Sequence, residues 1–131
     1  MARSLIDTNI AILLIEGDEA TLRRVDALPE APLLSVVSSV ELEAGLYESG
    51  KEDVDLRRRL NLLLDRVDEL PFTSREVGAY GTIVAALGYS RRMIIDRMIA
   101  ATALTQNVTL LTANPRDFRG IPGLTIEDWS N

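Results

Sequence analysis

The 131-residue chain contains no histidine, no cysteine and only one lysine. Without imidazole or thiolate groups, any catalysis has to depend on carboxylates and hydroxyls, and we expect a metal ion to assist them. The absence of cysteine excludes disulfide bonds and zinc sites built from thiolates, and it is compatible with a protein of the reducing cytoplasm. The other thirteen basic residues are arginines, whose planar guanidinium groups suit bidentate contacts to phosphate.

The chain also lacks a long apolar run. The longest, residues 10–15, is far shorter than the ~20 residues of a membrane span, and Asp7 interrupts the first apolar stretch, so we expect neither a membrane helix nor a signal peptide. The net charge of −6 argues against broad attraction to nucleic acids or anionic membranes, but it leaves room for a local basic groove. With 47% hydrophobic residues, residues 1–131 are expected to form one folded domain.

Short apolar segments alternate with helical patterns, and this alternation predicts an α/β fold with a mainly parallel sheet. The expected strands are residues 3–7, 33–37, 69–72, 108–112 and 124–126. The expected helices are residues 9–16, 19–27, 38–50, 54–67, 74–87 and 94–105. The first of these helices is predicted to be covered on all sides, and Ser38 with Glu41 has the spacing of a capping box at the start of the third.

Asp7 lies at the junction of the first expected strand and the first expected helix. Open α/β sheets place their chemistry at the carboxyl ends of strands, so a carboxylate at this position is a candidate site residue. Aspartate is also a favourable helix N-cap, and the position alone favours neither explanation.

Glu41 and Asp96 are two further acidic candidates that also have ordinary structural explanations. Glu41 fits the back-bonding position of the capping box, whereas Gly45 one turn later leaves space for another chain or a ligand. Asp96 lies in the first turn of an expected helix, where the helix dipole stabilises a negative charge. Small side chains at Ala100 and Ala103 on the same face would let neighbouring elements crowd around its carboxylate.

Further polar candidates follow the fourth expected strand and precede Asp96. Thr112, Asn114 and Asp117 are possible supporting positions, although the Asn-Pro pair after residue 113 is also typical of a turn. Arg91 and Arg92 lie just before Asp96 and therefore beside the candidate site. They could contact a phosphate backbone there or simply form a solvated surface.

The order and spacing of four motifs resemble a PIN-domain nuclease, and more specifically the VapC-type toxin of a bacterial toxin–antitoxin pair. The motifs are an apolar strand ending in Asp-Thr-Asn at residues 7–9, Glu-Leu-x-x-Gly at 41–45, Asp-x-x-Ile-Ala-Ala-Thr-Ala-Leu at 96–104 and Leu-Leu-Thr-x-Asn-x-x-Asp-Phe at 110–118. A C-terminal Ile-Pro-Gly-Leu-x-Ile-x-x-Trp extends the similarity over nearly the whole chain.

The resemblance implies a three-layer α/β/α fold around a mainly parallel sheet of four to five strands. Asp7, Glu41 and Asp96 would converge at the strand ends as catalytic groups and hold Mg²⁺ or Mn²⁺. The implied activity is that of a cytoplasmic endoribonuclease that cleaves structured RNA, such as tRNA or rRNA, with a metal-activated water. The resemblance further implies a homodimer and a cognate VapB-type antitoxin, which would place an arginine against the acidic site.

Two positions depart from the pattern of the family. Asn114 stands where other members carry Asp, which weakens the case for a tightly held second metal ion. Met93-Ile94-Ile95 stands where many members carry Gly or Pro, which makes the approach to Asp96 bulkier.

Other proteins with an aspartate after the first strand fit less well. A haloacid-dehalogenase-type site would need a second Asp at the position of Asn9, and a receiver-type domain would need a lysine at a late strand end, whereas Lys51 lies in a helical region. A non-catalytic RNA- or protein-binding module on a degenerate nuclease fold stays open as the alternative.

Overall fold

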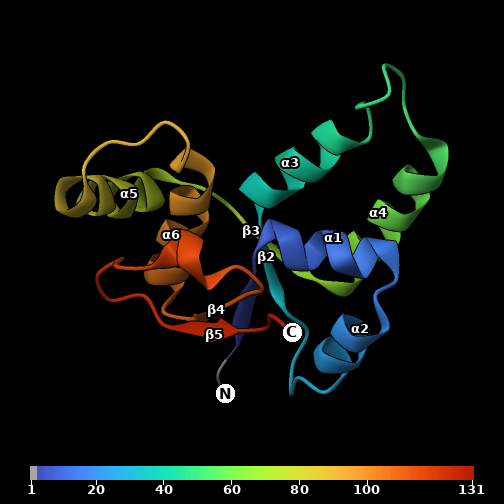
Figure 1. The fold of residues 1–131 in the computed structure, drawn as a ribbon, viewed down its shortest axis with the longest axis horizontal. Coiled ribbons are helices and arrows are strands. Elements are labelled where there is room, and N and C mark those ends of the chain that lie inside the picture. The colour runs from blue at the N-terminus through green and yellow to red at the C-terminus, as the bar shows by residue number, and fades with distance from the viewer. Residues whose placement is uncertain (1–2) are drawn as a thin grey trace.

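The structure is a computed structural model that describes residues 3–131. Within that range the framework is a five-stranded sheet in the order β3-β2-β1-β4-β5, and every neighbouring pair of strands is parallel (Figure 1). The strands are β1 Ser4–Ile6, β2 Leu33–Ser35, β3 Asp68–Leu70, β4 Thr109–Thr112 and β5 Ile126–Asp128. The predicted α/β fold is confirmed, and the sheet has five strands, the upper end of the expected four to five.

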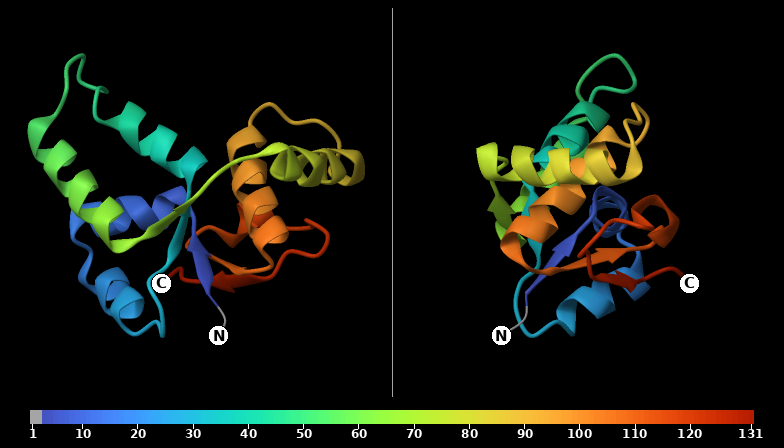
Figure 2. Two further views of the ribbon diagram at one scale, coloured as in Figure 1. Left: turned by 180° about the vertical axis from the view of Figure 1, so that it is seen from behind. Right: turned by 90° about the vertical axis from the view of Figure 1, so that its left-hand side faces the viewer.

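Helices cover both faces of this sheet and make it the middle of three layers (Figures 1 and 2). On one face lie α1 Thr8–Glu16, α2 Glu19–Asp26, α3 Val36–Gly45 and α4 Val54–Arg66. On the other lie α5 Ser74–Leu87 and α6 Ile94–Gln106, and a short 3₁₀ helix, η1 Pro115–Phe118, follows β4. Over residues 3–131, every helix is too short or too polar to span a membrane.

The central strands supply a separate core to each face. Successive side chains of a strand point to opposite faces of the sheet. Ile6 and Leu111 pack with α1–α4, whereas Leu5 and Leu110 pack with α5 and α6, and all four are fully buried. Burial of one such side chain contributes about 1.5–3 kcal/mol. The ends of β1 and β4 are therefore firmly placed by packing on both sides.

Helix α1 begins directly after β1 and ends at Gly17, whose φ of 80° is left-handed and favours glycine. The prediction that this helix is covered on all sides is wrong. Only Ile10 and Ala11 are buried in it, and Ile12 is 39% exposed. The physical reason is that Ile12 faces an open pocket instead of a packed neighbour.

Strand β2 is shorter than predicted and α3 begins earlier. The strand ends at Ser35, whose hydroxyl accepts a hydrogen bond from the Val37 amide and so caps α3. The predicted capping box of Ser38 and Glu41 is therefore wrong, because both residues lie inside the helix. The Glu41 carboxylate therefore takes no part in capping α3.

The last strand is also displaced from the predicted residues 124–126. Leu124 still belongs to a turn, since its amide donates a hydrogen bond to the Ile121 carbonyl and the preceding Gly123 has a φ of 79°. The first hydrogen bond to β4 runs from the Leu110 amide to the Thr125 carbonyl, and the strand itself begins at Ile126.

A buried carboxylate joins the two helices of the second face. Glu76 of α5 is 2% exposed, and it accepts hydrogen bonds from the Thr73 amide and hydroxyl and from the Thr105 hydroxyl of α6. Burial alone would raise the pKa of Glu76. The hydrogen bonds from Thr105 and Thr73 outweigh that effect and lower the pKa to about 2.

We expect Glu76→Gln to lower the free energy of unfolding by about 1–3 kcal/mol near neutral pH, because an amide replaces charge-assisted hydrogen bonds while still filling the capping position. The folded-state pKa of Glu76 is depressed below its ordinary value of 4.5. The advantage of the wild type is thus present above that pH and lost as the pH falls towards about 2. Urea unfolding of both proteins across this pH range measures the difference in the free energy of unfolding. A difference that is independent of pH would contradict the depressed pKa of Glu76.

Candidate active site

The candidate site lies at the carboxyl ends of the three central strands. Asp7 follows β1, Ser35 ends β2 and leads into α3, and Thr112 ends β4. From β1 the sheet grows in one direction through β2 and β3, whereas β4 and β5 are added on the opposite side of β1. This edge is therefore the point at which the strand order reverses, and open α/β sheets bind their ligands at such points.

A pocket of about 400 Å³ opens at this edge and is lined by Asp7, Glu41 and Asp96. The three residues belong to the end of β1, to α3 and to the first turn of α6, so the fold brings distant parts of the chain together. Apolar side chains of α1, α3 and α4 complete the wall: Ile12, Ile15, Leu42, Leu46, Leu56 and Leu60. A larger pocket of about 550 Å³ lies beside α2 and α4, away from all three carboxylates.

Asp7 is 3% exposed and is a helix cap and a pocket residue at once. Its Oδ1 accepts a hydrogen bond of 2.9 Å from the Ile10 amide at the start of α1. Burial raises the pKa of Asp7, and this effect exceeds the lowering caused by hydrogen bonds from Thr112 and Ile10. The two explanations that the sequence left open are therefore compatible with each other.

Glu41 is oriented by a hydroxyl for which the sequence analysis assigned no role. The Thr8 hydroxyl donates a hydrogen bond of 2.6 Å to Oε1 of Glu41 and lies 2.9 Å from the Ser38 hydroxyl. The signal for Thr8 was its place directly after Asp7 in the Asp-Thr-Asn motif. Gly45 lines the same pocket, and a Cβ at that position would meet only Glu48, at 4.0 Å. The predicted open space beside Gly45 is therefore present.

Asp96 is the acidic residue of the first turn of α6, a helix whose N-terminus has no side-chain cap. Burial, followed by the charges of Asp117, Glu41 and Asp7, raises the pKa of Asp96 to about 6, whereas the charge of Arg92 lowers it. The other three carboxylates are thus close enough to affect the protonation of Asp96. Two carboxyl groups with raised pKa values, Asp7 and Asp96, in one pocket are typical of a functional site.

Asp117 rather than Asn114 supplies the fourth negative charge. Its charge raises the pKa of both Asp7 and Asp96. The side chain of the exposed Asn114 donates a hydrogen bond of 2.7 Å from Nδ2 to Asp117 Oδ2. The backbone amide of Asn114 donates another, of 2.9 Å, to the Thr112 hydroxyl. The spacing of Asn114 and Asp117 within the single turn of η1 was the signal that these two side chains could meet.

The donor set fits a hard divalent cation by its chemistry and its location. Asp7, Glu41 and Asp96 offer only oxygen ligands in one pocket, which is what Mg²⁺ prefers. Within residues 3–131, no three acidic, histidine or cysteine side chains already lie at the spacing of a ligand shell. The carboxylates therefore have to converge further to hold an ion, as expected for like charges that repel one another.

The two arginines before Asp96 lie in the exposed connection between α5 and α6. Of these, Arg92 is near enough for its charge to lower the pKa of Asp96. By contrast, Arg58 and Arg59, which belong to a run of three arginines at residues 57–59, form ion pairs with Asp55 inside α4. The connection before α6 is therefore the basic surface that adjoins the acidic pocket.

Comparison with known proteins places this arrangement in a family. The PIN domain matches residues 4–124. The chain belongs to the PIN-domain family. Over 99% of its length this PIN domain is similar, at 30% identity, to the whole of the "tRNA(fMet)-specific endonuclease VapC" of Shigella flexneri. The predicted relationship to VapC-type proteins is thereby confirmed.

Solved structures share the fold of this PIN domain along nearly its full length. VapBC2 from Rickettsia felis, bound to a DNA fragment from its promoter, superposes with a TM-score of 0.86 at 24% identity and covers 97% of this chain and 98% of its own. VapBC-1 from nontypeable Haemophilus influenzae gives a TM-score of 0.80 at 27% identity, with 96% and 97% covered. The three-layer architecture is therefore that of the VapC-type fold.

We expect Asp96→Asn to remove a pH-dependent loss of stability from this PIN domain. The folded-state pKa of Asp96 is raised from 3.8 to about 6, so the stabilisation by its protonated form is complete below pH 3.8 and lost as the pH rises through about 6. With screening by solvent, the variant should gain about 1–2 kcal/mol relative to the wild type between those limits. Denaturant unfolding without divalent ions measures this difference, and parallel pH profiles would contradict the raised pKa.

Proposed function

We propose that this chain is a metal-dependent endoribonuclease and the toxin of a VapBC-type toxin–antitoxin pair. The observation that carries the proposal is the pocket at the reversal point of the sheet, which is lined by Asp7, Glu41 and Asp96. The relative from Shigella flexneri, which is named as an endonuclease, supports the reaction class. In this proposal, residues 1–131 are a single nuclease domain that acts in the cytoplasm.

Asp7, Glu41 and Asp96 would hold Mg²⁺, or Mn²⁺, through their carboxylate oxygens. A divalent cation bound there would lower the pKa of water and stabilise negative charge on the phosphoryl oxygens. Thr8 fixes the orientation of Glu41, and Asn114 holds Asp117 towards the same acidic cluster. Because the chain has no histidine, the protein supplies no imidazole to protonate the leaving oxygen, and we expect water at the cation site to provide that proton.

The proposed substrate is a structured RNA, such as tRNA or rRNA, that is cut where its bases are unpaired and accessible to a protein. Arg91 and Arg92 are exposed beside the acidic pocket and can contact phosphates there. The net charge of −6 leaves little general attraction to nucleic acid, so affinity depends on such local contacts.

The proposed partners are a second copy of the chain and a VapB-type antitoxin. The fold shared with VapBC-1 at 27% identity supports an antitoxin of that type. An arginine from the antitoxin would fit the acidic pocket, because a guanidinium group forms bidentate hydrogen bonds with carboxylates. This contact would inhibit cleavage by occupying the position of the cation.

We expect Asp7→Asn and Asp96→Asn to abolish Mg²⁺-dependent RNA cleavage while the protein stays folded, because asparagine also caps α1 at position 7. At 100 times its dissociation constant, Mg²⁺ should stabilise the wild type by about 2.7 kcal/mol and raise its Tm by about 10 °C. Cleavage assays and thermal melts test both effects. As a control, Asp65→Asn removes an exposed carboxylate of α4 and should leave activity and the Mg²⁺ response unchanged.

Full activity of Asp96→Asn would show that the proposed site is wrong. A wild type that binds RNA or a protein partner but cleaves no RNA with Mg²⁺ or Mn²⁺ would favour the alternative, a non-catalytic binding module on a degenerate nuclease fold.

Expression of this chain alone should arrest bacterial growth, and co-expression with the product of its neighbouring gene should restore it. Asp96→Asn should be harmless in both cases, since toxicity depends on cleavage. Growth curves and sequencing of the RNA ends formed on induction measure these effects. Equal growth with and without the neighbouring gene product would argue against a toxin.

A further inference from the structure

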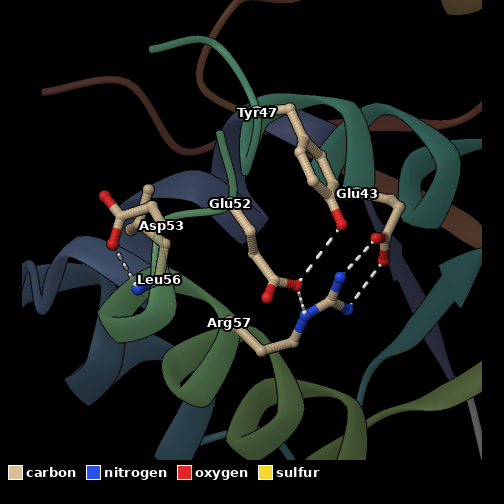
Figure 3. A network of polar contacts seen from close by, with 6 residues as sticks. All are labelled: Glu43, Tyr47, Glu52, Asp53, Leu56 and Arg57. Carbon is tan, nitrogen blue, oxygen red and sulfur yellow. Dashed lines mark hydrogen bonds and ion pairs between the residues drawn. The ribbon is translucent and has the colours of Figure 1, made fainter. Parts of the chain in front are cut away.

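A network centred on one arginine joins the C-terminal end of α3 to the N-terminal end of α4 (Figure 3). The guanidinium group of Arg57, in α4, donates hydrogen bonds to both carboxylate oxygens of Glu43 in α3, one of them at 2.9 Å. Its Nε donates a third hydrogen bond of 2.8 Å to Glu52, which the Tyr47 hydroxyl also approaches at 3.4 Å. We call Arg57, Glu43 and Glu52 the α3–α4 clamp.

The clamp spans the two walls of the candidate pocket. Helices α3 and α4 both pack on α1, and each contributes apolar side chains to the pocket, such as Leu42 from α3 and Leu60 from α4. Glu41 lies in α3 only two residues before Glu43. Any tilt of the C-terminal half of α3 therefore changes the width of the pocket and the position of Glu41 together.

The other end of α3 is already fixed by the sheet. Ser35 continues β2 directly into the helix and caps it. The Thr8 hydroxyl then orients the Glu41 carboxylate, but it does not fix the helix backbone beyond Glu41. Towards the C-terminal end, the backbone link to the α4 side is the hydrogen bond of 2.8 Å from the Asp53 amide to the Leu46 carbonyl. The clamp adds a bidentate side-chain link at the same end, and bidentate pairs fix geometry as well as distance.

We propose that Arg57 is a positioning residue that fixes the C-terminal half of α3 and thereby places Glu41 for cation binding. The metal-binding part of this inference rests on the function proposed above. The fixing of α3 does not.

The clamp is suited to geometry more than to overall stability. The side chains of Arg57 and Glu43 are 30% and 49% exposed, and ion pairs with such exposure contribute little to the free energy of unfolding. Arginine cannot be replaced by lysine at a forked site without losing the bidentate contact. The neighbouring Arg58 offers a matched control, because it pairs with Asp55 in its own helix.

The experiment compares the wild type with Arg57→Ala, Arg57→Lys, Glu43→Gln and Arg58→Ala. Amide hydrogen exchange of residues 42–46 is measured first without metal, and the Mg²⁺ midpoint is then measured by thermal shift. Arg57→Ala and Glu43→Gln should speed exchange in α3 and raise the Mg²⁺ midpoint several-fold, by less than the roughly tenfold cost of losing a partner bonded directly to a metal ligand. Arg57→Lys should be intermediate, and Arg58→Ala should match the wild type in both measurements.

The double variant Glu43→Gln/Arg57→Ala should be no worse than Arg57→Ala alone, because Arg57→Ala already removes the contact to Glu43. Unchanged exchange in α3 and an unchanged Mg²⁺ midpoint in Arg57→Ala would overturn the proposal, as would an equal effect of Arg58→Ala. If the wild type shows no Mg²⁺ response, the proposed metal site is wrong. Faster α3 exchange in Arg57→Ala would then still support the fixing of α3, and unchanged exchange would overturn it.

Discussion

Electrostatic repulsion between carboxylates that share one partly buried pocket is the constraint on which the rest of this structure depends. Two like charges about 4 Å apart cost about 4 kcal/mol at an effective dielectric constant of 20. Here Asp117, Glu41 and Asp7 all raise the pKa of Asp96. Packing of β1 and β4 between two cores counters this repulsion, because it places the strand ends independently of the acidic side chains.

Helix N-termini and a hydroxyl group stabilise the individual carboxylates against the same repulsion. Asp7 caps α1, and Asp96 lies in the first turn of α6, so both are near helix N-termini, where partial positive charge stabilises an anion by about 0.3–1 kcal/mol. Glu41 accepts a short hydrogen bond from Thr8. These contacts orient the acidic groups without neutralising them, which leaves their negative charge available to a cation.

Much of this arrangement follows from sequence, because alternating strands and helices with aspartates at strand ends leave few other topologies. The order of elements and the parallel sheet were predictable in this way. Asp7, Glu41 and Asp96 each had an ordinary structural explanation, and the resemblance to PIN-domain nucleases was what joined them into one predicted set. The capping box at Ser38 was wrong because Ser35 competes for the same helix start and lies directly at the strand end. The exposure of Ile12 and the place of Asp117 were not predictable either, since both depend on how α1 and η1 pack in three dimensions.

The most direct test follows the carboxyl carbon signals of Asp7, Glu41 and Asp96 by NMR while Mg²⁺ is added. All three signals should respond with one common midpoint, and the pKa of Asp96 should fall from about 6, since a cation replaces mutual repulsion with attraction. Three independent midpoints, or a response of one carboxylate alone, would contradict the claim that these residues form a single cation-binding set.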